Sequence, residues 1–125
     1  MTTLVPVTGF LDEPTQLLLT TTDVTDVKAI AAGTTAITTV HGMILVNAGA
    51  SARVVSVWVV KDTTSRLIWT GSIAAGTTET EALKYPLKLY AKSTARKITA
   101  QAAAANEVTV TLITSLASQS GTGAA

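Results

Sequence analysis

His41 is the only histidine of the chain, and histidine is the usual general base of a hydrolytic site because it titrates near neutral pH. A Ser-His-Asp arrangement would have to be built on this residue. His41 lies in the run TTVHGMILV, where it shares the alternation of Met43 and Leu45. This setting is typical of a histidine packed in a strand or at its rim. We therefore expect no catalysis at His41.

Glu79 and Glu81 have the spacing at which two side chains of one strand point the same way. Paired carboxylates can hydrolyse glycosides when one of them is desolvated in a cleft, and the surrounding sequence shows no sign of a cleft. The chain has no cysteine, which removes thiolate nucleophiles and sulfur ligands for metals. Its glycines match neither GxGxxG nor GxxxxGK(S/T), the two glycine-rich patterns of nucleotide-binding loops. The sequence thus predicts no enzyme, no metal and no cofactor.

Basic residues recur in the second half of the chain, at Lys84, Lys88, Lys92, Arg96 and Lys97. Tyr90 lies between Lys88 and Lys92, and basic residues interleaved with an aromatic ring can hold single-stranded nucleic acid. Such binding normally needs more stacking surface and more positive charge than this chain carries. We interpret the stretch as a solvated strand face that keeps a sheet edge from pairing. Docking on an acidic protein surface is the alternative.

The large aromatic residues Trp58, Trp69 and Tyr90 have three possible uses. Exposed and coplanar rings on a sandwich would form a sugar-binding face. Buried rings would simply pack in the core, which is the commoner place for large aromatic side chains. Rings at the centre of a protein contact would act as anchors. The sequence leaves these three uses open.

Charged residues make up 14% of the 125 residues, against 47% hydrophobic residues, and the formal net charge is +1. With so small a net charge, the electrostatic field of the protein is too weak to attract nucleic acid or membranes. No segment reaches the roughly eighteen apolar residues of a membrane-spanning helix, and the N-terminal sequence lacks the regions of a signal peptide. We expect a protein made in the cytoplasm, with protein partners and with neither nucleic acid nor membrane among them.

Short strands are the elements expected to carry these residues. Thr, Val and Ile are plentiful, which favours pleated surfaces, and turn clusters such as NAGAS, KDTTSR and AAGTT recur at the roughly 8 to 12 residue spacing of a sandwich. We predict strands at 17–21, 27–31, 36–47, 53–61, 66–72, 80–84, 87–92, 95–102 and 107–115. The pattern predicts an all-β, single-domain β-sandwich, jelly-roll-like, with about eight strands.

The domain plan has three parts. We expect an extended N-terminal arm at 1–16, the β-sandwich domain at 17–116 and a flexible C-terminal tail at 117–125, because Pro and Gly interrupt the first segment and small polar residues fill the last.

The run RVVSVWVVK, at 53–61, is apolar on both faces of a strand. Its outward positions include Val54, Trp58 and Val60. A two-layer sandwich covers only the inner face of each strand, and a bare apolar patch is normally a contact site. Either the N-terminal arm around Phe10 covers this set or another subunit does. An arm that crosses to a neighbouring subunit would combine the two.

From 38 to 116 the chain combines an apolar strand ending in LVNAGASA, a Val-rich strand, IAAGTTET before a leucine strand, AKSTARKITAQA and a final alternating strand. This arrangement resembles small β-sandwich structural proteins of tailed-phage virions, such as head decoration (cement) proteins and related head or tail accessory proteins. The resemblance implies a virion protein that works as a homo-oligomer, with a trimer favoured. It also implies docking on a shell through an arm or a loop edge.

We therefore predict a non-enzymatic virion structural protein, specifically a capsid decoration protein that stabilises the assembled head by binding it. Its predicted partners are copies of itself and the major capsid protein or another virion protein. The predicted contact residues are Phe10, Val54, Trp58 and Val60, with Lys88, Tyr90 and Lys92 as a docking rim. The alternatives are a carbohydrate-binding or adhesin-type module and a tail or adaptor component of the virion.

Overall fold

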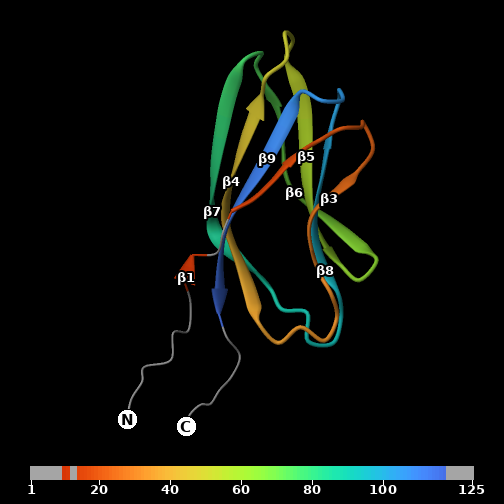
Figure 1. Cartoon of the computed structure of the whole chain (residues 1–125), viewed down its shortest axis with the longest axis vertical. Helices are drawn as coiled ribbons and strands as arrows, with labels where there is room; N and C mark the ends of the chain where they lie inside the picture. Colours follow the sequence, from red (N-terminus) through yellow and green to blue (C-terminus); the bar gives the residue numbers. More distant parts are fainter. Residues whose placement is uncertain (1–9, 12–13, 118–125) are drawn as a thin grey trace.

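The computed structural model describes residues 10–11 and 14–117, which form nine strands in two antiparallel sheets and no helix (Figure 1). The strands are β1 (Phe10–Leu11), β2 (Thr15–Leu18), β3 (Thr25–Ile30), β4 (Ile37–Asn47), β5 (Arg53–Lys61), β6 (Thr64–Ile73), β7 (Thr77–Leu89), β8 (Arg96–Ala102) and β9 (Val108–Ala117). The predicted all-β, single-domain sandwich is confirmed.

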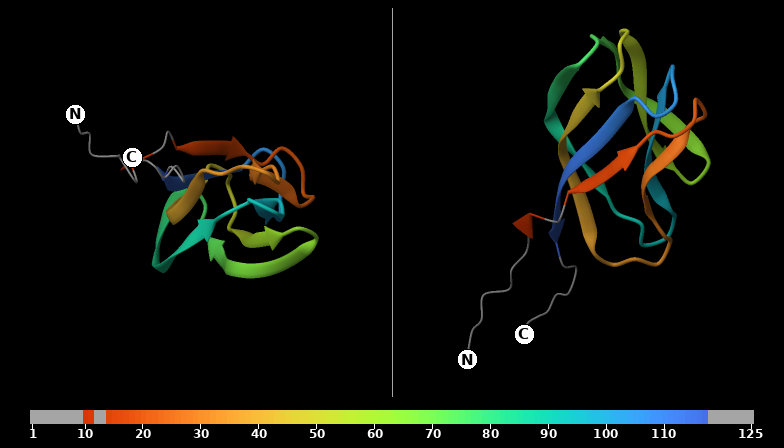
Figure 2. Two further views of the ribbon diagram at one scale, coloured as in Figure 1. Left: turned by 90° about the horizontal axis from the view of Figure 1, so that it is seen from below. Right: turned by 45° about the horizontal axis from the view of Figure 1, so that its top comes forward.

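The strand order is that of a jelly roll. One sheet, sheet A, has the order β2-β9-β4-β7, with the short β1 pairing further along β9, and the other, sheet B, has the order β3-β8-β5-β6. Each strand of the first half thus pairs with one of the second half: β5 with β6, β4 with β7, β3 with β8 and β2 with β9. The chain is one long hairpin rolled into two layers (Figure 2), which is the eight-stranded jelly-roll plan.

A two-residue turn closes the central hairpin. Lys61 pairs with Thr64, so Asp62 and Thr63 make the reversal. Asp62 has φ 58°, a left-handed conformation that aspartate tolerates better than most residues, and its N–H donates to the carbonyl of Ala95 at 3.0 Å. This hydrogen bond connects the turn between β5 and β6 to the residue that precedes β8.

The core lies between the sheets and is built by strict alternation. In β9, Val108, Val110 and Leu112 are fully buried, and the residues between them are half-buried on the outer face. Met43 and Leu45 of β4 are the partners of Leu112 and Val110, and both are buried as well. The alternation predicted for the last strand is confirmed.

Strand β7 differs from the prediction, because the runs predicted at 80–84 and 87–92 form one strand. Val40 pairs with Leu87 and Gly42 with Ala82, so 83–86 have no partner on β4 and bulge out of the ladder. Pro86 explains the irregularity, since it has no N–H to donate. Gly42 is needed opposite the bulge, because a Cβ there would lie 2.6 Å from the carbonyl oxygen of Glu81.

The predicted arm lies largely outside the described residues, which exclude 1–9 and 12–13. Where the arm is described, it belongs to sheet A. Phe10 pairs with Leu116 on β9, and β2 begins at Thr15 and pairs with the same strand. The sheet therefore starts earlier than position 17. The predicted tail at 118–125 also lies outside the description.

Candidate functional site

His41 lies half-buried on the outer face of sheet A, where its Nε2 is 2.7 Å from the Oγ of Ser115 on β9. The bond ties the two central strands of the sheet together. Among the hydrogen bonds of the described residues, none joins the imidazole to a carboxylate, and the same residues contain no cluster of three side chains able to ligate a metal. The described part of the chain also contains no helix long and apolar enough to cross a membrane.

Glu79 and Glu81 come together with Trp69 at the open side between the two sheets. Their partners on β4 are the buried Leu45 and Met43, so both carboxylates lie on the inward side of the edge strand β7. A hydrogen bond to Glu79, with partial burial and the charge of Glu79, raises the pKa of Glu81, and a hydrogen bond from the indole of Trp69 acts against this rise. The charged form of Glu81 is therefore disfavoured next to Glu79.

Replacing Glu81 with glutamine is therefore expected to stabilise the fold at neutral pH. The folded state raises the pKa of Glu81, so folding favours the protonated form, and this stabilisation is lost as pH rises from the unfolded pKa through the raised one. Glutamine keeps a hydrogen bond to Glu79 without the repulsion. Urea unfolding between about pH 4 and 8 should show the variant more stable than wild type at the upper end and equal to it at the lower end.

The matched control is Asp23→Asn, which removes an exposed carboxylate outside this pair and should shift stability little. A Glu81→Gln gain of the same size at every pH would contradict the raised pKa of Glu81.

An apolar patch lies on the outer face of sheet B. Trp58 on β5 is half-buried and pairs across strands with Leu67 on β6, which is 53% exposed. Val54, earlier on β5, is 54% exposed, and beside it a cavity of about 350 Å³ is lined in part by Ser56 and Gln101. We call Val54, Trp58 and Leu67 the tryptophan patch. Val54 and Leu67 are thus more than half exposed, whereas Trp58 is exposed only in part.

The expectation that Val60 lies bare is wrong, because Val60 is only 4% exposed. It points to the same face as Trp58 and has Lys97 of β8 and Ser65 of β6 as cross-strand partners. Lys97 is held by an ion pair with Asp26 at 3.1 Å. Neighbouring side chains of sheet B thus cover Val60 within the chain.

The three large aromatic residues do not form one platform. Trp69 pairs with the buried Val57 and packs against the core, and a Cβ on Gly71 would lie 2.8 Å from its ring. Trp69 therefore faces inward while Trp58 faces outward. Tyr90 is half-buried in the segment after β7.

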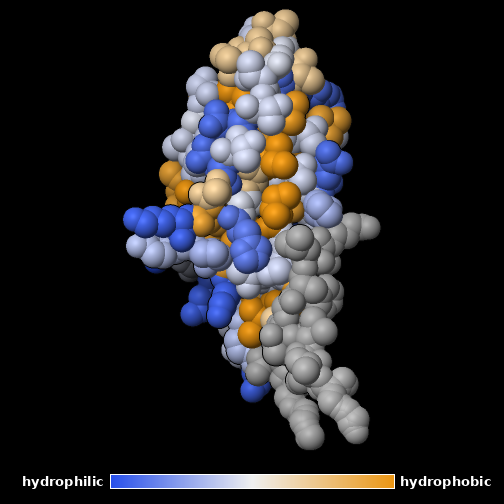
Figure 3. Space-filling view, turned by 90° about the vertical axis from the view of Figure 1, so that its left-hand side faces the viewer, coloured by the Kyte–Doolittle hydropathy of each residue, from blue (hydrophilic) through white to orange (hydrophobic). Residues whose placement is uncertain are grey.

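The outer face of sheet A is almost uncharged along its two central strands. Ile44, Val46 and Ile113 alternate there with threonines, and all are half-buried. Close to His41 this face has an apolar cavity of about 270 Å³, lined in part by Ile44 and Ile113. The side of the molecule on which β7 lies shows hydrophobic residues among weakly polar and strongly hydrophilic ones (Figure 3).

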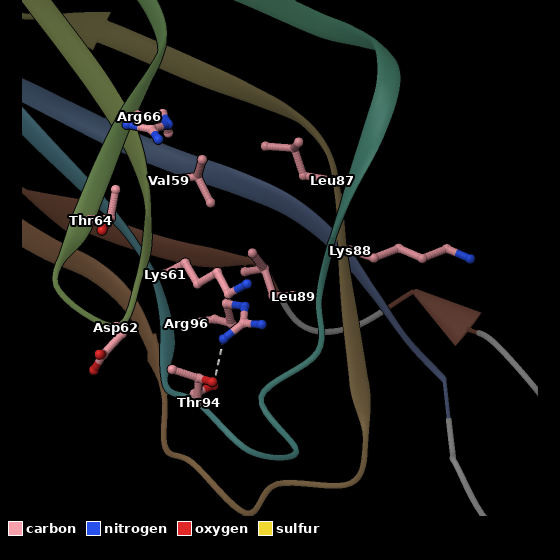
Figure 4. Close-up of a pocket in the computed structure, with 10 residues that line it drawn as sticks. All are labelled: Val59, Lys61, Asp62, Thr64, Arg66, Leu87, Lys88, Leu89, Thr94 and Arg96. Carbon is pink, nitrogen blue, oxygen red and sulfur yellow. Dashed lines mark hydrogen bonds between the residues drawn. The ribbon is translucent and has the colours of Figure 1, made fainter.

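A pocket of about 500 Å³ lies between the β5–β6 hairpin and the end of β7 (Figure 4). We call it the basic pocket; its lining residues are Val59, Lys61, Asp62, Thr64, Arg66, Leu87, Lys88, Leu89, Thr94 and Arg96. Of the predicted docking rim, only Lys88 belongs to this set, and its side chain points away from the others. Lys92 is exposed elsewhere.

The structure does not bring the predicted contact residues to one surface. Phe10 lies in a strand that pairs with β9 in sheet A, whereas Val54 and Trp58 lie on the outer face of sheet B. Lys88 is paired with Thr39 on sheet A. The described part of the arm therefore does not cover the tryptophan patch.

Sequence reasoning missed Leu67, Arg66 and the exposed Tyr85. On β6 the alternation of side chains is reversed next to Leu67, because Val57 pairs with Trp69 but Trp58 pairs with Leu67, which leaves one extra residue on β6. A sequence pattern with a period of two cannot reveal such a bulge. Tyr85 is 77% exposed, with the Lys84 ammonium 5.5 Å from its ring centre. Pro86 directly after it was the available signal, because proline cannot donate to the ladder and is found in sheets at edge strands and bulges.

No protein-family model and no curated protein matches the chain. Among solved structures it is similar to that of the infectious bursal disease virus Gx strain, with 12% identity and TM-score 0.46 over 86% of this chain and 33% of that one. It is also similar to the CBM22-1–GH10 modules of Clostridium thermocellum xylanase 10B complexed with xylohexaose, with 12% identity and TM-score 0.38 over 77% and 19%. The chain spans about a third or less of these proteins. With TM-scores this low, function has to be argued from the residues of this chain.

Proposed function

We propose that this chain is a non-enzymatic structural protein of a virion, specifically a capsid decoration protein that binds the assembled head as a homo-oligomer, with a trimer favoured. The observation that carries the proposal is the tryptophan patch, where Leu67, 53% exposed, lies beside the half-buried Trp58, and Val54, 54% exposed, lies four positions earlier on the same strand. An apolar set of this kind on a rigid sheet is a natural contact site. The sequence resemblance to small sandwich proteins of phage virions supports the virion as its place.

The energy available from the patch suits a protein that works in many copies. Covering a large apolar side chain contributes about 1.5 to 3 kcal/mol, and association itself costs several kcal/mol in lost freedom. Three such side chains therefore make a weak pairwise contact. An oligomer that presents several patches to a regular lattice gains by multivalency, and each occupied site stabilises the assembled lattice by mass action.

The direct test is mass spectrometry of purified particles from the virus that encodes this chain, with the expected result that the protein is present in the many copies of a lattice component. Its absence from particles would overturn the proposal. Presence only at the tail would favour the tail or adaptor alternative.

A second test addresses the patch itself. Sedimentation of the purified protein should show concentration-dependent association that is lost in Leu67→Glu. The matched control is Leu18→Glu, since Leu18 is also exposed, at 42%, but lies on β2 in sheet A. Equal loss of association in both variants would show that the tryptophan patch is not the contact.

Carbohydrate binding is the second candidate, and the partial exposure of Trp58 on a flat sheet face favours it. An exposed indole can stack on a sugar ring, although Trp69 faces the core and adds nothing to the platform. Titration with polysaccharides should then shift the fluorescence of wild type and leave Trp58→Ala unchanged. A shift that follows protein concentration alone favours assembly.

A further inference from the structure

The basic pocket combines an apolar floor with a positive rim. Val59 of β5 and Leu87 of β7 pack partly against the core, and Leu89 is buried. Figure 4 shows Val59 and Leu87 facing each other across the pocket, with Leu89 beside Lys61 and Arg96. The pocket thus offers hydrophobic contact to a side chain that enters between the two sheets.

Three cationic side chains of the basic pocket, Lys61, Arg66 and Arg96, lie on neighbouring strands of sheet B. Lys61 on β5 is the direct cross-strand partner of Arg96 on β8, and Arg66 on β6 is the partner of Val59, two positions earlier on β5. Like charges opposite each other in a sheet are destabilising. Neither ion pair seen among the described residues, Arg53–Glu107 and Lys97–Asp26, involves these three cations.

The one acid of the lining does not neutralise the rim. Asp62 lies in the hairpin turn, and Figure 4 shows its carboxylate directed away from the three cations. Arg96 donates to the carbonyl oxygens of Thr94 and Ala95 at 2.8 and 3.3 Å, which fixes its guanidinium at the rim without supplying an anion. The pocket therefore carries a local positive charge in a chain whose net charge is only +1.

The strands next to the basic pocket and the residue types of its lining indicate which kind of ligand it can bind. β6 and β7 are the edge strands of their sheets in the described fold, so the backbone groups on their outer sides are available to an added extended segment. No aromatic side chain lines the pocket, whereas single-stranded nucleic acid is normally held by stacking. We propose that the basic pocket binds an acidic, extended segment of a partner protein. An apolar side chain of this segment meets Val59, Leu87 and Leu89, and its carboxylates meet Lys61, Arg66 and Arg96.

This inference goes beyond the proposed function, because the basic pocket is separate from the tryptophan patch and would serve a docking protein of any location. Charge complementarity steers such a segment to the pocket and sets its orientation, while the apolar side chain supplies the contact that salt does not screen. Binding should weaken with added salt without being abolished.

The test uses the whole chain and a set of short fluorescein-labelled peptides in which one apolar residue lies among glutamates. Fluorescence anisotropy should show saturable binding of at least one peptide, weakened about tenfold or more by Arg66→Glu. Lys84→Glu is the matched control, because Lys84 is exposed outside the pocket and should leave the affinity unchanged. Arg66 is exposed, so its variant should fold, which circular dichroism checks.

Amide chemical-shift mapping locates the site. Shifts at 59–66 and 87–96 on adding peptide are the expected result, and shifts confined to other segments contradict the proposal. It is overturned as well if no peptide binds saturably, if a peptide with serine in place of the apolar residue binds equally well, or if inorganic phosphate or a single-stranded oligonucleotide competes at equal affinity.

Discussion

Replacing Leu45 with alanine is expected to lower the free energy of unfolding by about 3 kcal/mol. Leu45 is fully buried in the middle of β4, with Val110 of β9 and Glu79 of β7 as cross-strand partners. Truncation removes apolar contacts and leaves a cavity between the two sheets, and β4 cannot move to fill it because it is paired with β7 on one side and β9 on the other. Urea unfolding followed by circular dichroism measures the loss.

Ile44→Ala is the matched control, because Ile44 is the preceding residue on the same strand and points to the outer face, where it is half-buried. Its loss is expected to be about 1 kcal/mol, in proportion to the smaller area removed from water. If the two variants lose equal stability, the assignment of inner and outer faces in β4 is wrong.

Asn47→Ala is expected to be comparably damaging, with a loss of about 3 kcal/mol. Asn47 is fully buried at the end of β4. Its Nδ2 donates to the carbonyls of Ser51 and Ile73 at 2.8 and 3.0 Å, and its Oδ1 accepts from the N–H of Gly49 at 2.9 Å. Alanine leaves these backbone groups without partners. Since Ile73 ends β6, the variant also loses a bond that joins sheet A to sheet B.

Thermal unfolding and urea titration measure this effect, with Ser51→Ala as the control. The side chain of Ser51 is exposed and only its backbone carbonyl is used by Asn47, so its removal should change stability by about 0.5 kcal/mol or less. A mild Asn47→Ala variant would mean that water replaces the amide in the loop, and that the loop is not held by this side chain.

The strands could be predicted because their side chains alternate. Val108, Val110 and Leu112 face the core as expected, and the boundaries of β5 at 53–61 agree with the structure. The apolar residues on both faces of β5 also led correctly to Val54 and Trp58 on the outer side. The prediction for Val60 failed because Val60 is flanked on sheet B by β6 and by β8, and β8 is distant in sequence.

The candidate sites were predicted only in part, because bulges and register decide which side chains meet. The bulge at 83–86 and the irregularity next to Trp58 each reverse the alternation, so Tyr85 and Leu67 become exposed where a period of two gives no sign. Of the basic pocket, the sequence reasoning singled out Lys88 and Arg96. Lys61 and Arg66 join Arg96 there only because the central hairpin is rolled against β7 and β8.

The sequence by itself determined that this protein is an all-β sandwich, since β-branched residues alternate along short runs that turn clusters separate. It also determined that one strand has more apolar surface than the core can take. Which surfaces are bare, and which cations share a pocket, was decided only by the tertiary structure. The physical reason is that the alternation of inward and outward side chains is a local property of the backbone. The burial of a surface residue and the distance between charges depend instead on which strands the jelly roll brings together.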